Sequence, residues 1–150
     1  MKKIIFVCTG NTCRSPMIEH ILKHKLKLND INNIKVNSAG IMAQPNTYTS
    51  KYTLQALKNM GINARRKKAR QLTIDMVDKD TLLIAITNNH KEYIKNVGRV
   101  MSLSDFYSGI DVVDPYGQDI SAYEKCAKIF DFITDEIVQL IKKGDLVWYI

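Results

Sequence analysis

Residues 3–16 of the chain read KIIFVCTGNTCRSP, and this stretch decides the fold. The run from Lys3 to Cys8 is rich in β-branched and aromatic residues, which predicts a short buried strand. A helical pattern begins at Ser15, and Ser15 and Pro16 suit a first helical turn. Its apolar face is formed by Met17, Ile18, Ile21, Leu22 and Leu26. The stretch is therefore predicted to be a strand, a short loop and a helix.

Strand and helix patterns alternate along the rest of the chain. Further strands are predicted at residues 34–39, 81–87 and 99–103. Helices are predicted at residues 50–60, 72–77 and 88–97 and from Ile120 onward, with a loop over 104–117. Such alternation gives parallel strands joined by right-handed crossovers. We predict an α/β fold: a three-layer sandwich with a central four-stranded parallel sheet and helices on both faces. Ligands bind beyond the carboxyl ends of such strands.

Composition is typical of a globular protein. The 150 residues are 45% hydrophobic and 25% charged, and no linker or repeat divides them, so one domain spanning residues 1–150 is expected. Three cysteines are too few for a disulfide scaffold, and no apolar run is long enough to cross a membrane. We therefore expect a cytoplasmic protein without a membrane partner. A net charge of +7 favours acidic or phosphorylated partners.

The loop after the first strand has the composition of a phosphate-binding loop. Its backbone N–H groups stand at a helix N-terminus, where they and the helix dipole attract anions. Gly10 and Asn11 tolerate the left-handed backbone that an anion-binding turn requires, and Arg14 can hold two phosphate oxygens at once. The residues predicted to bind phosphate are Thr9, Gly10, Asn11, Thr12, Cys13, Arg14 and Ser15.

Cys8 stands at the base of this loop and is the candidate nucleophile. The field of the loop is predicted to lower the pKa of its thiol, and the Ser15 hydroxyl can donate a hydrogen bond to the sulfur. The spacing of Cys8 and Cys13 does not suit a zinc site. The loop also lacks the Gly-Lys-Ser/Thr of a nucleotide-binding loop. The pattern Cys-x5-Arg-Ser therefore favours attack on phosphorus.

Four segments together resemble the low-molecular-weight protein tyrosine phosphatase family. They are Cys8 to Pro16, Ser38-Ala39-Gly40, Ala69-Arg70-Gln71-Leu72 and Asp114-Pro115-Tyr116-Gly117, and they occur in the order found in the family. The resemblance extends over nearly the whole chain. It implies a phosphatase that acts on phosphorylated proteins, releases inorganic phosphate and needs no metal or cofactor.

The resemblance also implies roles for residues outside the loop. Asp114 matches the general acid of the family, which completes a catalytic set with Cys8 and Arg14. Tyr116 matches an aromatic residue at the pocket, and Met42 is expected at its rim. Cys13 lies close enough in sequence to pair reversibly with the oxidised nucleophile, although it can equally serve only in packing.

Two positions leave questions open. Many members have a histidine before the segment 69–71 that supports the loop asparagine, whereas this chain has Lys67 near that position. Thr12 bears on substrate choice, because the family pairs an apolar residue there with phosphotyrosine. Threonine occurs there in bacterial members that look like protein-arginine phosphatases. We therefore expect a phosphotyrosine phosphatase, with a protein-arginine phosphatase as the alternative.

Two rival functions fit less well. An arsenate reductase on this fold requires additional resolving cysteines, and the chain has none between Cys13 and Cys126. A non-catalytic binder of phosphate or nucleic acid is compatible with the net charge. However, the basic residues are not interleaved with aromatic residues in the way that nucleic-acid binders show. We therefore expect no nucleic-acid partner. The sequence does not predict an oligomeric state.

Overall fold

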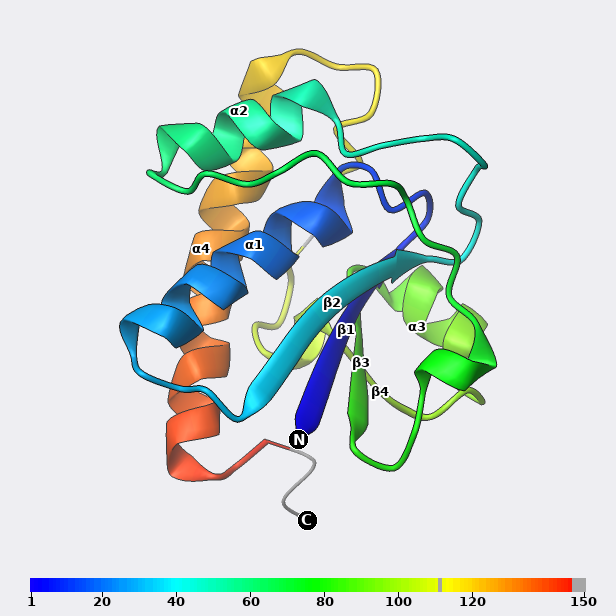
Figure 1. The fold of residues 1–150 in the computed structure, drawn as a ribbon, viewed down its shortest axis with the longest axis vertical. Helices are drawn as coiled ribbons and strands as arrows, with labels where there is room; N and C mark the ends of the chain where they lie inside the picture. The colour runs from blue at the N-terminus through cyan, green and yellow to red at the C-terminus, as the bar shows by residue number, and fades with distance from the viewer. Residues whose placement is uncertain (111, 147–150) are drawn as a thin grey trace.

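A computed structural model describes residues 1–110 and 112–146. Its centre is a four-stranded parallel sheet, as predicted from the alternating pattern (Figure 1). The strands lie in the order β2-β1-β3-β4. The strands are β1 (Lys2–Cys8), β2 (Ile34–Gly40), β3 (Thr81–Ala85) and β4 (Arg99–Ser102). Because all four run in the same direction, their carboxyl ends meet at one edge of the sheet.

Helices cover both faces of the sheet, which confirms the three-layer prediction. They are α1 (Arg14–Leu28), α2 (Lys51–Asn59), α3 (Asn88–Ile94) and α4 (Ile120–Lys143). Single 3-10 turns lie at η1 (Ile74–Met76) and η2 (Leu103–Asp105). In Figure 1, α1, α2 and α4 lie together on one face, and α3 lies on the other. No helix among the residues described is long and apolar enough to cross a membrane.

The central strand β1 is buried on both faces, which explains its continuous apolar run. Ile4 and Phe6 pack into the large cluster that includes α1, α2 and α4. Ile5 and Val7 point the other way, into the smaller cluster that contains Ile94 of α3. The loop that follows β1 is thus anchored to the most enclosed element of the molecule.

Several boundaries differ from the sequence prediction. Residues 72–77 contain only the single turn η1, and α3 ends at Ile94 instead of continuing to Val97. Helix α1 begins at Arg14 with Cys13 at its N-cap position, where no side chain caps the helix. The Ser15 hydroxyl therefore does not cap this helix. It faces the sulfur of Cys8 instead, and this places it in the candidate site.

Candidate active site

The loop from Thr9 to Cys13 turns sharply at Asn11, whose φ is 58°. This confirms a left-handed residue in the loop, although Gly10 has no positive φ and does not share that role. A left-handed conformation is uncommon for a residue other than glycine, and it persists where the surrounding contacts hold it. Three such contacts reach the Asn11 side chain.

The Asn11 amide is bonded on both ends. Its Nδ2 donates to the Ser15 hydroxyl at 2.8 Å and to the Ser38 hydroxyl at 2.9 Å. Its Oδ1 accepts from the backbone N–H of Arg70 at 2.9 Å. The side chain is almost completely buried, with a relative exposure of 1% for the residue. These bonds tie the loop to α1, to β2 and to the segment that precedes η1.

Glu19 and Lys67 extend this network away from the loop. The Ser38 hydroxyl donates to the fully buried Glu19 carboxylate at 2.5 Å, and Lys67 pairs with the same carboxylate oxygen. Lys23 contacts the other oxygen at 2.6 Å. Burial raises the pKa of Glu19, but the charge of Lys67 and the three hydrogen bonds outweigh it, so the pKa lies below its ordinary value. Lys67 therefore supports Asn11 indirectly, through Glu19 and Ser38.

Gly40, the last residue of β2, allows the end of this strand to approach the loop closely. A Cβ atom at this position would lie 2.5 Å from the Thr9 carbonyl oxygen and 3.1 Å from the Asn11 nitrogen. The backbone N–H groups of Ile41 and Met42 donate to the carbonyls of Cys8 and Thr9, each at 2.9 Å. The segment Ser38-Ala39-Gly40 thus acts as a fitted backbone support for the loop.

The Cys8 sulfur lies 2.8 Å from the Ser15 hydroxyl oxygen, and both residues are buried. Burial raises the pKa of the Cys8 thiol above its ordinary value. The Ser15 hydroxyl, the backbone N–H groups of Ser15 and Asn11, and the charge of Arg14 act in the opposite direction. The raised pKa is opposite to the lowered pKa predicted from the sequence. That prediction counted the field of the loop and omitted the cost of burying a thiolate.

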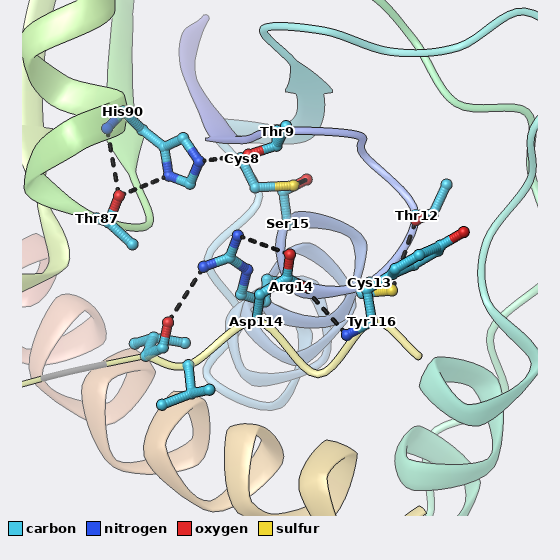
Figure 2. Close-up of polar contacts among 12 residues, drawn as sticks. Cys8, Thr9, Thr12, Cys13, Arg14, Ser15, Thr87, His90, Asp114 and Tyr116 are labelled. Atoms are coloured by element: carbon cyan, nitrogen blue, oxygen red, sulfur yellow. Dashed lines mark hydrogen bonds and ion pairs between the residues drawn. The ribbon is translucent and has the colours of Figure 1, made fainter. Parts of the chain in front are cut away.

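Arg14 connects the loop to the segment before α4. Its NH1 donates to the Val112 carbonyl at 3.1 Å, and its NH2 lies 3.7 Å from a carboxylate oxygen of Asp114. Figure 2 shows the Arg14 side chain directed toward Asp114. The Arg14 side chain is 7% exposed, whereas that of Asp114 is 53% exposed. The Tyr116 N–H donates to Asp114 at 3.1 Å, which orients the carboxylate.

A cavity of ≈ 320 Å³ brings most of the predicted site together. Its lining comprises Cys8, Thr9, Gly10, Thr12, Cys13, Arg14, Met42, Gln44, Thr47, Asp114 and Tyr116. The catalytic candidates Cys8, Arg14 and Asp114 thus border one space, although more than a hundred residues separate the first and last in sequence. Asn11 and Ser15 are not among the lining residues. The Ser15 hydroxyl contacts the Cys8 sulfur, and the Asn11 amide bonds to Ser15 and thereby shapes the loop. Met42 and Tyr116 are exposed at the rim, as expected.

Known proteins of one family match this chain over nearly its whole length. The family model described as low molecular weight phosphotyrosine protein phosphatase matches residues 3–145. The chain belongs to this family. A protein-arginine-phosphatase of Bacillus subtilis is 34% identical, with 93% of this chain and 97% of that protein covered. The low molecular weight protein-tyrosine-phosphatase PtpB of Staphylococcus haemolyticus is 33% identical, over 82% and 88%.

A solved structure of a YwlE arginine phosphatase mutant, with a phosphorylated active-site serine, has the same fold. Its TM-score is 0.86 at 31% identity, with 97% of this chain and 99% of that chain covered. The low-molecular-weight phosphatases are hydrolases that depend on a cysteine. Membership therefore confirms the family, the fold class and the enzyme class predicted from the sequence.

His90 of the phosphatase contacts the loop and was missed in the sequence. Its Nε2 lies 2.9 Å from the Thr9 hydroxyl, and its Nδ1 lies 2.9 Å from the Thr87 hydroxyl (Figure 2). Burial and the nearby charge of Arg14 lower the pKa of His90 to about 4, despite the opposite effect of Asp114. No motif includes this histidine. Its position shortly after β3, at the carboxyl edge of the sheet, is the sequence feature that could have placed it near the site.

Cys13 is buried beside the loop with its sulfur 3.4 Å from the Tyr123 hydroxyl. The Thr12 hydroxyl lies 3.5 Å from the same sulfur. All three cysteines of the phosphatase are free thiols. The role of Cys13 as redox partner of Cys8 therefore stays a prediction.

Proposed function

We propose that this phosphatase hydrolyses phosphoproteins in two steps, with Cys8, Arg14 and Asp114 as its catalytic residues. In the first step the Cys8 thiolate attacks phosphorus, the S–P bond forms and the bond to the leaving atom breaks. Asp114, which borders the same cavity, donates its proton to the leaving atom. Arg14 and the loop N–H groups hold the three equatorial oxygens, where the transition state keeps its charge.

In the second step water hydrolyses the cysteinyl-phosphate. The Asp114 carboxylate takes a proton from the attacking water, the S–P bond breaks and inorganic phosphate leaves. The Ser15 hydroxyl, 2.8 Å from the sulfur, donates a hydrogen bond to the departing thiolate. The same contact stabilises the thiolate before the attack, against the cost of its burial.

The substrate residue that we propose is phosphoarginine, and the position of Thr12 carries this proposal. Thr12 lines the cavity together with Cys8 and the rim residues Met42 and Tyr116. A guanidinium group presents several N–H donors in one plane, which suit a hydroxyl and a carboxylate better than an apolar wall. Thr12 supplies the hydroxyl, and Asp114 can accept through its carbonyl oxygen while its protonated oxygen donates to the leaving nitrogen. The 34% identity to a protein-arginine-phosphatase supports the same choice.

Phosphotyrosine is the second candidate, because the exposed aromatic ring of Tyr116 and the exposed Met42 side chain at the rim favour it. Tyr116 and Met42 are 76% and 58% exposed beside the cavity and can pack against an aromatic ring. The staphylococcal relative is named a tyrosine phosphatase at 33% identity. The two candidates share the same chemistry at phosphorus and differ in the group that must fit beside Thr12.

A comparison of two substrates tests this choice. The ratio of kcat/KM for phosphoarginyl and phosphotyrosyl peptides is measured for the wild type, Thr12→Ile and Thr12→Ser. We expect the wild type to prefer phosphoarginine, Thr12→Ile to lower the ratio about tenfold or more, and Thr12→Ser to preserve it. A ratio that Thr12→Ile does not change would rule out Thr12 as the selector.

The nucleophile is tested separately with p-nitrophenyl phosphate in EDTA. We expect Cys8→Ser to abolish turnover while inorganic phosphate still binds to the loop. Undiminished hydrolysis by this variant would refute the mechanism.

We also propose the cytoplasm as the location, because the Cys8 thiol must stay reduced to act.

A further inference from the structure

A groove of ≈ 1270 Å³ continues outward from the active-site cavity. Thr12, Cys13, Thr47 and Tyr116 border both spaces, so the groove starts where the cavity ends. Its walls come from residues 46–52, from α2 and residues 62–66, and from the segment 116–118 before α4. A peptide chain attached to a phosphorylated residue in the cavity can therefore extend directly into the groove.

The groove is basic. Its charged lining residues are Lys51, Lys58 and Arg66, and no aspartate or glutamate lines it. All three cations are exposed. Within residues 1–110 and 112–146, none of them has a carboxylate within 4.0 Å. These positive charges are therefore available to a ligand, unlike that of Lys67, which is paired with Glu19.

One wall of the groove is held in place by backbone pairing. Tyr48 forms an antiparallel bridge with Lys68, and Ala69 N–H donates to the Thr47 carbonyl at 2.9 Å. The Arg66 guanidinium lies over the Tyr48 ring, 4.2 Å from its centre, which orients the charge. At the inner end, the Ser50 N–H donates to the Thr12 carbonyl at 2.8 Å. The groove is thus fastened directly to the phosphate-binding loop.

We propose that this groove binds an acidic segment of the phosphoprotein substrate, adjacent to the phosphorylated residue. The inference rests on the proposed phosphatase function and adds a preference for sequence context. Arg66 on the fixed wall, together with Lys51 and Lys58 of α2, complements a run of carboxylates. A second copy of this chain carries the same net charge of +7 and is the less suitable occupant.

The test compares two short phosphoarginine peptides that differ only in their flanking residues, glutamate in one and glutamine in the other. We expect the wild type to show a kcat/KM about fivefold higher for the glutamate peptide at low salt, because three exposed contacts contribute modestly each. This ratio is expected to approach one at 1 M salt. Lys58→Glu and Arg66→Glu are each expected to lower the ratio about threefold. Lys79→Glu is the matched control, because this exposed lysine lies outside the groove, before β3.

A second measurement separates the groove from the chemistry. Fluorescence anisotropy follows binding of the unphosphorylated glutamate peptide to the wild type and to Lys58→Glu. Binding that Lys58→Glu weakens supports the groove, even if no phosphopeptide is hydrolysed, in which case only the proposed function fails. Equal kcat/KM values for the two peptides, or equal effects of Lys58→Glu and Lys79→Glu, would overturn the proposal.

Discussion

The Ser38 hydroxyl donates to one carboxylate oxygen of Glu19 at 2.5 Å, and Lys67 pairs with that same oxygen. Ser38 in turn accepts from the Asn11 amide at 2.9 Å. A surface-facing lysine is therefore connected to the left-handed residue of the phosphate-binding loop through two buried side chains. Since Glu19 is fully buried, its charge depends on this pairing.

We expect Lys67→Met to lower the free energy of unfolding by about 2 kcal/mol, because Lys23 is then the one ion-pair partner of the buried carboxylate among residues 1–110 and 112–146. Adding Glu19→Gln to this variant removes the unpaired charge and is expected to restore about 1 kcal/mol of that loss. Urea unfolding of the single and double variants measures both effects. Strictly additive losses would show that the pair is not coupled.

Ser15→Ala is expected to raise the pKa of the Cys8 thiol further, because the Ser15 hydroxyl is the largest of the contributions that lower it. At a fixed neutral pH the thiolate fraction then decreases, and the pH profile of inactivation by iodoacetate shifts to higher pH. Ser38→Ala is the matched control, because it removes the other Asn11 acceptor without touching the sulfur. A larger shift in Ser38→Ala than in Ser15→Ala would contradict the assignment.

Asp114→Ala is expected to reduce kcat about a hundredfold or more for phenyl phosphate, a substrate with a poor leaving group. The loss for p-nitrophenyl phosphate is expected to be much smaller, since that leaving group departs without protonation. Asp119→Ala is the control, because this nearby carboxylate caps α4 through Ser121 and does not line the cavity. Equal losses on both substrates would remove Asp114 as the acid.

His90 is expected to make the protein less stable in mild acid. Its pKa is about 4 in the fold and 6.5 ordinarily, so the unfolded chain binds the extra proton between these values. The free energy of unfolding therefore falls as the pH decreases from 6.5 to 4, by on the order of 2 kcal/mol from this group. His90→Gln is expected to lack this part of the pH dependence in urea unfolding. An equal decrease in the free energy of unfolding of the wild type and of His90→Gln over this pH range would refute the role of His90.

Much of the fold could be predicted because its elements are determined by local patterns. The runs at Ile4 to Cys8 and Leu82 to Ile86 are apolar throughout, as strands buried on both faces must be. The errors lie where tertiary contacts decide. Residues 72–77 have a helical pattern, yet Leu72 N–H pairs with the Gly40 carbonyl at 2.8 Å, and only one helical turn remains.

The proposed catalytic set was also accessible from the sequence, since Cys8 and Arg14 belong to one short loop and Asp114 was indicated by the family resemblance. The residues that hold the loop from other elements could not be identified from the sequence. His90 reaches the loop from α3 through a long-range hydrogen bond to Thr9, and Glu19 acts on Asn11 only through Ser38 of β2. No local spacing in the sequence encodes these contacts. The pKa of Cys8 was misjudged for a related reason, because the degree of burial emerges only from the complete packing.

The close fit of Gly40 against Thr9 separates what can vary in this enzyme from what cannot. The backbone of the loop lies directly against the backbone at the end of β2, so a side chain at position 40 would displace the loop. The rim, by contrast, consists of protruding side chains such as Tyr116 and Met42. Substitutions at the rim can therefore change which substrates such a protein accepts, while the loop and the reaction at phosphorus stay the same.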